Sequence, residues 1–205
     1  MDLINEENLE SLCEHLAERD TDLAFIFKTC GTPPLWKRAE SFPTLVHIIL
    51  EQQVSLASAR SAFEKLKERL GEITPEAVLS LSDTELKQAY FSRQKTVYVR
   101  ELAGTIIEKR LDLERLQGLS DEDVKIELKR IKGIGDWTSD IYLLMAMSRR
   151  DVMPKGDLAL HIAYKKLKNL EDAPHSEEFQ QIAEKWKPLR SVAARLLWHF
   201  YLSTK

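Results

Sequence analysis

Two glycines, Gly133 and Gly135, stand one residue apart in the stretch KGIGDWTSD, between two segments whose apolar residues recur at helical spacing. Glycine reaches positive φ without steric cost and, because it has no side chain, lets another backbone come close. Such a pair predicts the bend of a helix-hairpin-helix, in which the unpaired N–H groups that open the second helix can bind an anion such as a phosphate group. A plain helical corner with Ile134 in the core would use the same residues, and the spacing alone does not separate the two interpretations.

Three aspartates accompany the glycine pair: Asp136 and Asp140 in the same stretch, and Asp157 in the sequence DVMPKGDLAL. A carboxylate can stabilise positive charge that develops in a transition state, and on residue type alone the three compete for such a role. Asp136 lies within the bend, where the backbone should face an anion. Asp140 falls one helical turn later, on what we expect to be an ordinary surface. Asp157 follows Gly156 and could equally cap a helix, because Asp is a favoured capping residue.

Helical signals run through the chain and must position these residues. Apolar residues such as Leu45 and Ile48 recur at helical spacing, whereas the alternation typical of strands is nearly absent. Ser82 with Glu85 fits a capping box, and Ser120 precedes acidic residues that favour a helix N-terminus. The sequence therefore predicts an all-α fold. Its longest expected helical stretches are residues 44–70, 94–110, 120–131, 137–147, 157–168 and 188–202.

The composition is that of a globular protein: 205 residues, 43% hydrophobic, 31% charged, with a net charge of −3. The average charge argues against a nucleic-acid partner, but residues 1–119 carry 15 basic and 20 acidic side chains, whereas residues 120–205 carry 15 and 13. No signal or transit peptide and no apolar run of membrane-spanning length is apparent, and Cys13 and Cys30 are expected to be reduced thiols. We therefore expect a cytoplasmic protein with no membrane partner, associated with the nucleoid in a bacterium or nuclear in a eukaryote.

The stretch GIGDWTSD, followed by Asp151-Val-Met-Pro and by Asp157 within PKGDLAL, closely resembles the signature of the helix-hairpin-helix DNA glycosylase superfamily. That signature is a hairpin, a Gly/Pro-rich loop and an aspartate. More narrowly, the chain is similar to the 3-methyladenine DNA glycosylase II family, which removes alkylated bases. Three further segments match in the family's order, so that the resemblance covers most of the chain. They are LVHIILEQQVSLASA (45–59), FSRQK (91–95) and WKPLRSVAARLLW (186–198).

The resemblance implies two helical domains with a DNA-binding and active-site cleft between them. The middle domain, expected at residues 42–168, would hold the helix-hairpin-helix, the Gly/Pro-rich loop and the catalytic aspartate. The N- and C-terminal segments, residues 1–41 and 169–205, would together form the second domain.

The chemistry that the resemblance implies is cleavage of an N-glycosidic bond after the damaged nucleotide has been swung out of the duplex. Cleavage builds positive charge on the deoxyribose, and a carboxylate near the anomeric carbon stabilises that charge and directs a water molecule. Asp157 matches the family's catalytic aspartate. Bases alkylated at a ring nitrogen already carry positive charge and leave readily, so a single acid suffices.

A pocket for an electron-poor base should be lined with aromatic rings, because stacking and cation–π attraction favour cationic purines. Trp137 and Trp198 match pocket aromatics of the family. Tyr90 is expected in the pocket wall, with core packing as the alternative. Trp36 and Trp186 are expected in the protein core.

Gln53 matches the family's intercalating residue, the wedge that fills the space left by the flipped base, and Gln52 is expected beside the base pocket. Adjacent glutamines could instead mark an exposed kink in a helix. The hairpin would contact the DNA backbone, which positions DNA without reading its sequence. The residues expected to make this contact are Lys132, Gly133, Ile134, Gly135 and Thr138.

Two departures from the family pattern bear on the activity. Members that also cut the DNA backbone carry a lysine in the hairpin, where this chain has Trp137, so lyase activity is not expected. Asp136 places a negative charge where Arg or Pro is more usual. No cofactor or metal is expected, apart from a structural monovalent cation that the hairpin carbonyls could hold.

We therefore expect a monofunctional DNA glycosylase of base excision repair that acts on alkylated purines of the 3-methyladenine and 7-methylguanine type. Its partner would be double-stranded DNA that contains damaged bases, and we expect a monomer. Two alternatives stay open. A bifunctional glycosylase/lyase on other damaged bases would cut strands without added base, and a non-catalytic binder of damaged duplex DNA would release no base.

Overall fold

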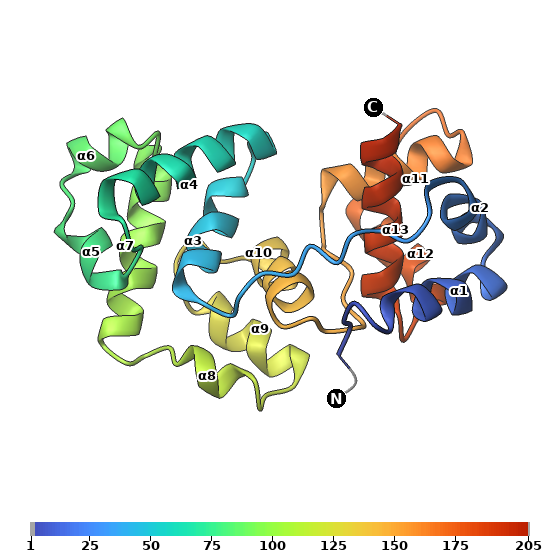
Figure 1. Ribbon diagram of the computed structural model, residues 1–205, viewed down its shortest axis with the longest axis horizontal. Coiled ribbons are helices and arrows are strands. Elements are labelled where there is room, and N and C mark those ends of the chain that lie inside the picture. The colour runs from blue at the N-terminus through green and yellow to red at the C-terminus, as the bar shows by residue number, and fades with distance from the viewer. Residues whose placement is uncertain (1–2, 205) are drawn as a thin grey trace. The chain divides into compact units, whose positions relative to one another are not determined.

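The computed structural model describes residues 3–204, and every regular element among them is helical (Figure 1). No residue in that range lies in a β-strand, so the prediction of an all-α fold is confirmed. None of the helices in the described range is both long and apolar enough to cross a membrane. The helices are α1 (Leu9–Arg19), α2 (Thr21–Cys30), α3 (Phe42–Glu51), α4 (Leu56–Leu70), α5 (Pro75–Ser80), α6 (Asp83–Gln88), α7 (Arg93–Ile107), α8 (Leu113–Leu116), α9 (Asp121–Lys129), α10 (Asp136–Ile141), a π-helical turn (Tyr142–Ala146), α11 (Leu158–Lys168), α12 (Ser176–Ala183), a 3-10 turn (Glu184–Trp186) and α13 (Arg190–Ser203).

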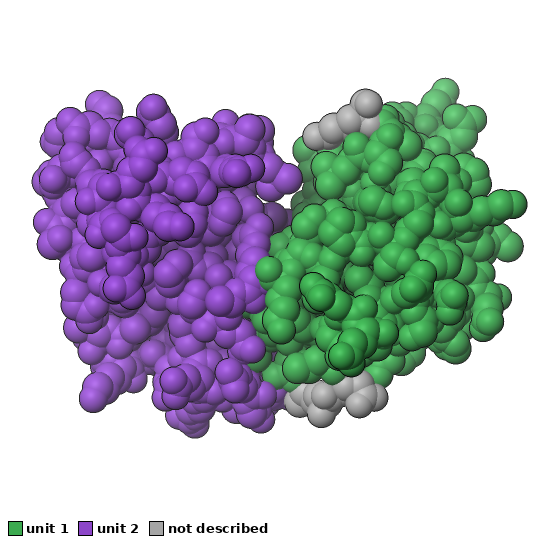
Figure 2. Space-filling model, viewed as in Figure 1, with its two compact units in different colours: residues 1–37, 143–205 green, residues 38–142 purple. Residues whose placement is uncertain are grey.

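The chain divides into two compact units (Figure 2). Of the described residues, 3–37 and 143–204 form unit 1, and 38–142 form unit 2. Unit 1 thus joins segments from both ends of the described chain. The predicted boundary at residue 168 differs from the structure, in which residues 143–168 belong to unit 1.

The helix α13 forms the centre of unit 1 and explains this difference. Its residues are buried along most of its length, and it contacts α1, α2 and α11. Because α11 packs against α13 and buries Leu160 and Tyr164, this helix belongs with the chain ends. Tyr164 also meets the rings of Phe179 and Trp186, and Trp186 lies in the core as predicted.

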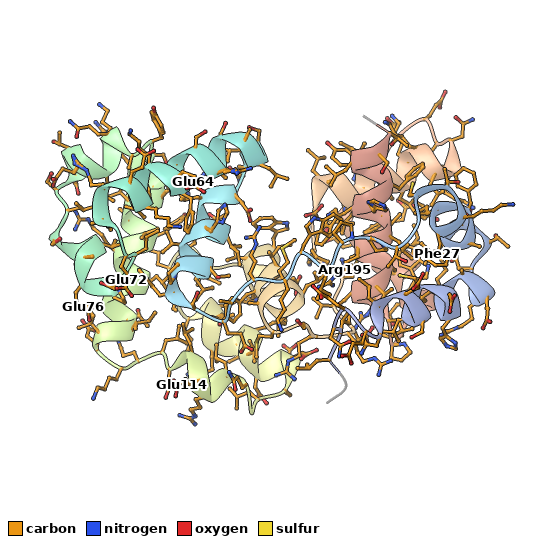
Figure 3. All side chains as sticks on the ribbon, in the orientation of Figure 1. Phe27, Glu64, Glu72, Glu76, Glu114 and Arg195 are labelled. Carbon is orange, nitrogen blue, oxygen red and sulfur yellow. The ribbon has the colours of Figure 1, made fainter. Side chains whose placement is uncertain are left out.

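Arg195 of α13 is fully buried and is labelled among the side chains of this helix in Figure 3. Its guanidinium donates hydrogen bonds to the carbonyl oxygens of Leu35 at 3.1 Å, Leu144 at 2.8 Å and Ser191 at 3.2 Å. Burial lowers the pKa of Arg195 to about 10. The three bonds connect the segment after α2 and the π-helical turn to α13.

In unit 2, the core is built around α3. Pro43 lies in its first turn, where the fixed φ of proline suits a helix start. Leu45, Ile48 and Ile49 are fully buried, and the helix packs against α4 and α7. Each such side chain contributes roughly 1.5–3 kcal/mol to stability through burial.

A turn separates α3 from α4, although the sequence predicts one helix over residues 44–70, so that prediction is wrong here. Gln53 has φ of 55°, a left-handed conformation that interrupts the helix. The hydroxyl of Ser55 then caps α4 by accepting a hydrogen bond from the N–H of Ser58 at 3.2 Å. The turn contains no glycine or proline, so the apolar pattern of the sequence does not indicate that the helix ends there.

The helices α9 and α10 form the predicted hairpin. α9 follows Ser120, whose hydroxyl accepts a hydrogen bond from the N–H of Asp123 at 3.2 Å. α10 begins at Asp136 and changes to π-helical geometry at Tyr142, whereas the sequence predicts a single helix over 137–147. The two helices contact each other within unit 2.

Candidate functional site

Asp157 precedes α11 and caps it. Its Oδ1 accepts hydrogen bonds from the N–H of Leu160 at 3.0 Å and from Nε1 of Trp198 at 3.1 Å. The residue is 8% exposed, so its carboxylate lies at the edge of solvent. The two donors hold it in place there. The two interpretations of this aspartate are therefore compatible, because one oxygen caps the helix and fixes the orientation of the group.

Trp198 comes from α13 and is as buried as Asp157. Its ring meets Trp36 edge to face, with 6.3 Å between the ring centroids. Trp36 was expected in the core, but it is only half-buried and has φ of 49°. No spacing signal identified Trp36, because it lies in an irregular segment after Pro33 and Pro34.

The two other aspartates occupy different environments. Asp140, which we expected on the surface, is 1% exposed and forms an ion pair with Lys125 at 2.8 Å, so that expectation is wrong. The pair connects α10 to α9, since one residue comes from each helix. Asp136 is partly exposed and forms an ion pair with Lys129 at 2.5 Å. Its charge thus has a cationic partner on α9.

The hairpin has the geometry that its glycines predict. Gly133 has φ of 97°, and a Cβ at this position would overlap the ring of Tyr98, so only glycine fits. Ile134 is buried and donates its N–H to the carbonyl of Ile131 at 3.0 Å. Gly135 is exposed and precedes α10 without a side-chain cap. Glycine at this N-cap position has no side chain that could accept a hydrogen bond from the N–H groups that open α10.

The remaining residues of the hairpin divide into an outer and an inner group. Lys132 is exposed next to the bend and can approach a phosphate. Trp137 is half-buried in the first turn of α10. Thr138 was expected to contact the DNA backbone, but its side chain is 2% exposed and its Oγ1 accepts a hydrogen bond from Gln52 at 2.9 Å. Its hydroxyl supports the hairpin from inside.

The adjacent glutamines have different environments. Gln52 is half-buried, and its Nε2 donates to the carbonyl of Gly133 at 2.8 Å as well as to Thr138. Gln53 is exposed in the turn between α3 and α4. The structure therefore brings Gln52 to the hairpin, and it presents Gln53 to solvent.

Tyr90 lies apart from the hairpin glycines in the chain but in the same unit. It is 66% exposed, has φ of 64° and borders a cavity of about 390 Å³. Leu50, Val54 and Lys95 also line this cavity. Burial lowers the pKa of Lys95, whose ammonium donates a hydrogen bond to the carbonyl of Leu50. Tyr90 is thus not a core residue.

Among the predicted site residues, Asp157 and Trp198 are joined in unit 1, and Gln52 is joined to Gly133 and Thr138 in unit 2. Sequence reasoning missed Tyr98, whose ring lies against Gly133, because a tyrosine at helical spacing in α7 carries no signal of such a contact. Within the described residues no cluster of three or more His, Cys, Asp or Glu side chains is arranged to bind a metal.

Comparisons with known proteins identify the family. Residues 46–188 match the family described as HhH-GPD superfamily base excision DNA repair protein. The putative DNA-3-methyladenine glycosylase YfjP of Bacillus subtilis is 28% identical over 201 residues, which cover 94% of this chain and 69% of that protein. The alkylbase DNA glycosidase-like protein mag2 of Schizosaccharomyces pombe is 26% identical over 192 residues, which cover 90% of each chain.

The solved structures include the 3-methyladenine DNA glycosylase Mag1 of Schizosaccharomyces pombe in complex with abasic DNA. It superposes with a TM-score of 0.87 at 27% identity and covers 92% of this chain and 95% of that chain. The family match extends over more than half of the sequence, and the structural match extends over nearly all of it. This chain belongs to the HhH-GPD superfamily of base excision DNA repair proteins.

Proposed function

We propose that this protein is a monofunctional DNA glycosylase of base excision repair that releases alkylated purines, of the 3-methyladenine and 7-methylguanine type, from duplex DNA. The observation that carries the proposal is the carboxylate of Asp157, oriented by Leu160 and Trp198 in a chain of this family. The substrate class is supported by the names of the relatives in Bacillus subtilis and Schizosaccharomyces pombe.

The proposed role of Asp157 is electrostatic. As the bond between the base and the deoxyribose lengthens, positive charge grows on the sugar, and an adjacent carboxylate stabilises it. Two donors on Oδ1 keep the group in one orientation, so that no reorganisation is needed during the reaction. The same carboxylate directs the water molecule that completes hydrolysis.

The proposed contacts to DNA come from unit 2. The N–H groups at Gly135 and the start of α10, with the ammonium of Lys132, suit the phosphates of the damaged strand. Gln53 is exposed on a short turn and would enter the base stack as the wedge. Base pairing and stacking together cost a few kcal/mol to disrupt, and the wedge offsets part of that cost.

Hydrolysis without strand cutting follows from the hairpin sequence. A lyase of this superfamily needs an amine at the position that Trp137 occupies, and an indole forms no Schiff base. Trp137 and Trp198 would instead stack on the cationic base, and Tyr90 and Gln52 were predicted beside them. A base pocket formed by these four residues stays a prediction.

Three further predictions remain open. A monovalent cation at the hairpin would use backbone carbonyls, of which Gly133 and Ile131 already accept hydrogen bonds from Gln52 and Ile134. No step of the proposed reaction depends on such an ion. The monomeric state and the cytoplasmic location also stay predictions.

The test is release of free base from methylated duplex DNA under single-turnover conditions, with strand integrity followed before and after alkali. Wild type should release methylated purines and leave strands that break only after alkali. Asp157→Asn should release base at least about 100-fold more slowly, because its amide oxygen can still accept both hydrogen bonds but carries no charge.

A matched control is Asp172→Asn, which removes an exposed carboxylate from the same unit and should leave the rate unchanged. Strand breaks before alkali would favour a bifunctional enzyme. Tight binding of damaged DNA with no base released by wild type would replace the proposal by a non-catalytic binder.

A further inference from the structure

A single side chain connects the turn that carries Gln53 to the hairpin. The amide nitrogen of Gln52 donates to the carbonyl of Gly133 at 2.8 Å and to Oγ1 of Thr138 at 2.9 Å, so both of its hydrogens are used. A carbonyl oxygen only accepts, and the nitrogen of the amide must therefore face Gly133. These contacts join segments that are 81 and 86 residues apart in the sequence.

The two ends of this connection have different proposed tasks. Gln52 follows the last residue of α3, and the next residue, Gln53, is exposed with φ of 55°. At the other end, Gly133 and Thr138 flank the start of α10, where a phosphate would bind. The wedge and the phosphate site are thus separated by one hydrogen-bonded side chain.

Other contacts hold both ends in place. Glu51 is almost fully buried and receives two hydrogen bonds from Arg38, at 3.0 and 2.7 Å, which fix the end of α3. On the hairpin side, the ring of Tyr98 lies against Gly133. Glu51 and Gly133 are each held by other contacts. The hydrogen bonds from Gln52 therefore set the distance between the end of α3 and the hairpin.

We propose that Gln52 is a positioning residue, which couples phosphate binding at the hairpin to insertion of Gln53 into the base stack. The inference rests on the proposed function and gives Gln52 a different task from the pocket contact predicted from the sequence. When the hairpin binds a phosphate, Gln52 holds Gln53 at a fixed distance from that phosphate, so that Gln53 can enter the base stack. Without Gln52, phosphate binding continues but the wedge turn moves independently, and fewer nucleotides are flipped.

The test variant is Gln52→Met, which keeps the side-chain length and removes both donors. Its affinity for undamaged duplex DNA should equal that of wild type, because the phosphate site is intact. The fraction of damaged nucleotides that are flipped out should fall about tenfold, as expected for the loss of two hydrogen bonds. The fluorescence of 2-aminopurine placed next to the lesion reports this fraction. The single-turnover rate of release of paired 7-methylguanine should fall by the same factor.

The decisive comparison uses the same lesion opposite an abasic-site analogue, where no base pair has to be broken. There the rate of Gln52→Met should return to within about twofold of wild type, because flipping costs less. An equal loss on both substrates would mean that Gln52 contacts the base directly and would overturn the proposal. A parallel loss of affinity for undamaged DNA would reduce Gln52 to a support of the hairpin and would also overturn it.

Three further variants sharpen the result. Thr138→Val removes one acceptor with little change in shape and should reproduce the effect in smaller degree, even if Gln52→Met folds poorly. Gln53→Ala combined with Gln52→Met should be no worse than Gln53→Ala alone, since both act through the wedge. Gln181→Met, at an exposed glutamine of α12, should behave as wild type.

If wild type releases no base, the proposed function fails, while the binding and flipping measurements still decide the role of Gln52.

Discussion

Nε1 of Trp198 donates a hydrogen bond to Oδ1 of Asp157 at 3.1 Å, and both side chains are almost fully buried. The two residues are 41 positions apart and come from α13 and the start of α11. The indole therefore orients the carboxylate proposed to stabilise the transition state, a task beyond the pocket contact that the sequence predicts for Trp198.

This contact predicts that Trp198→Phe slows base release on the order of tenfold in single-turnover assays. A ring remains, but a hydrogen bond to a charged group, usually about 1.5–3 kcal/mol, is lost. The matched control is Trp186→Phe, which removes a similar bond from Nε1 to Oδ2 of Asp20 at 2.9 Å. That change should lower stability and leave the rate of base release intact. Equal rates for Trp198→Phe and wild type would contradict the orienting role.

The two hairpin glycines should respond differently to alanine. Gly133→Ala would force the new Cβ into the ring of Tyr98 at a positive φ, so it should destabilise the fold by several kcal/mol and weaken DNA binding through local unfolding. Gly135→Ala meets no atom within 4 Å, and it should fold normally. If the backbone here approaches phosphate, Gly135→Ala still weakens binding to all duplex sequences. Thermal melting combined with a binding isotherm separates the two effects.

Asp136→Asn should strengthen binding to undamaged duplex DNA several-fold at low salt. The change removes a negative charge at the start of α10 and leaves Lys129 without this carboxylate partner, 2.5 Å away in the structure. The gain should vanish near 1 M salt, where the Debye length is about 3 Å. Glu127→Gln serves as control, because it removes the same charge from α9, where Glu127 pairs with Arg130 just after the helix. An unchanged affinity for Asp136→Asn would place the phosphate elsewhere.

Stability should fall as the pH drops below about 6.5, the ordinary pKa of histidine. Burial lowers the pKa of His161, although the charge of Asp157 and a hydrogen bond to Pro174 oppose the shift. Below pH 6.5 the unfolded chain takes up a proton that the folded chain does not, so acid favours unfolding. In His161→Gln, the free energy of unfolding from denaturant titrations should depend less on pH between pH 5 and 7. An unaltered dependence on pH would argue against a neutral His161. Exposed His15→Gln controls for the loss of a histidine.

Tyr90→Gly should be more stable than Tyr90→Ala by about 1 kcal/mol. Both variants lose the exposed ring, but only glycine adopts φ of 64° without strain. The usual order is the reverse, because glycine gives the unfolded chain more freedom. Chemical denaturation of the two variants decides the matter, and a more stable alanine variant would show that the left-handed conformation carries no cost.

Features that depend on neighbours along the chain can be predicted from the sequence. The capping box of Ser82 and Glu85 and the cap at Ser120 are present, since a cap is a contact across three residues. The bend at Gly133 was likewise readable, because glycine reaches the positive φ of such a bend without steric cost. The family resemblance supplied the role of Asp157, which residue type alone left open.

Features that depend on residues distant in sequence are visible only in the folded protein. The turn at Gln53 has no local marker, and the burial of Asp140 depends on Lys125 from another helix. The tasks of Gln52 and Trp198 depend on bonds that join positions 81 and 41 residues away. A hydrogen bond or ion pair forms only when packing brings its partners within about 3 Å, and local periodicity carries no information about that distance.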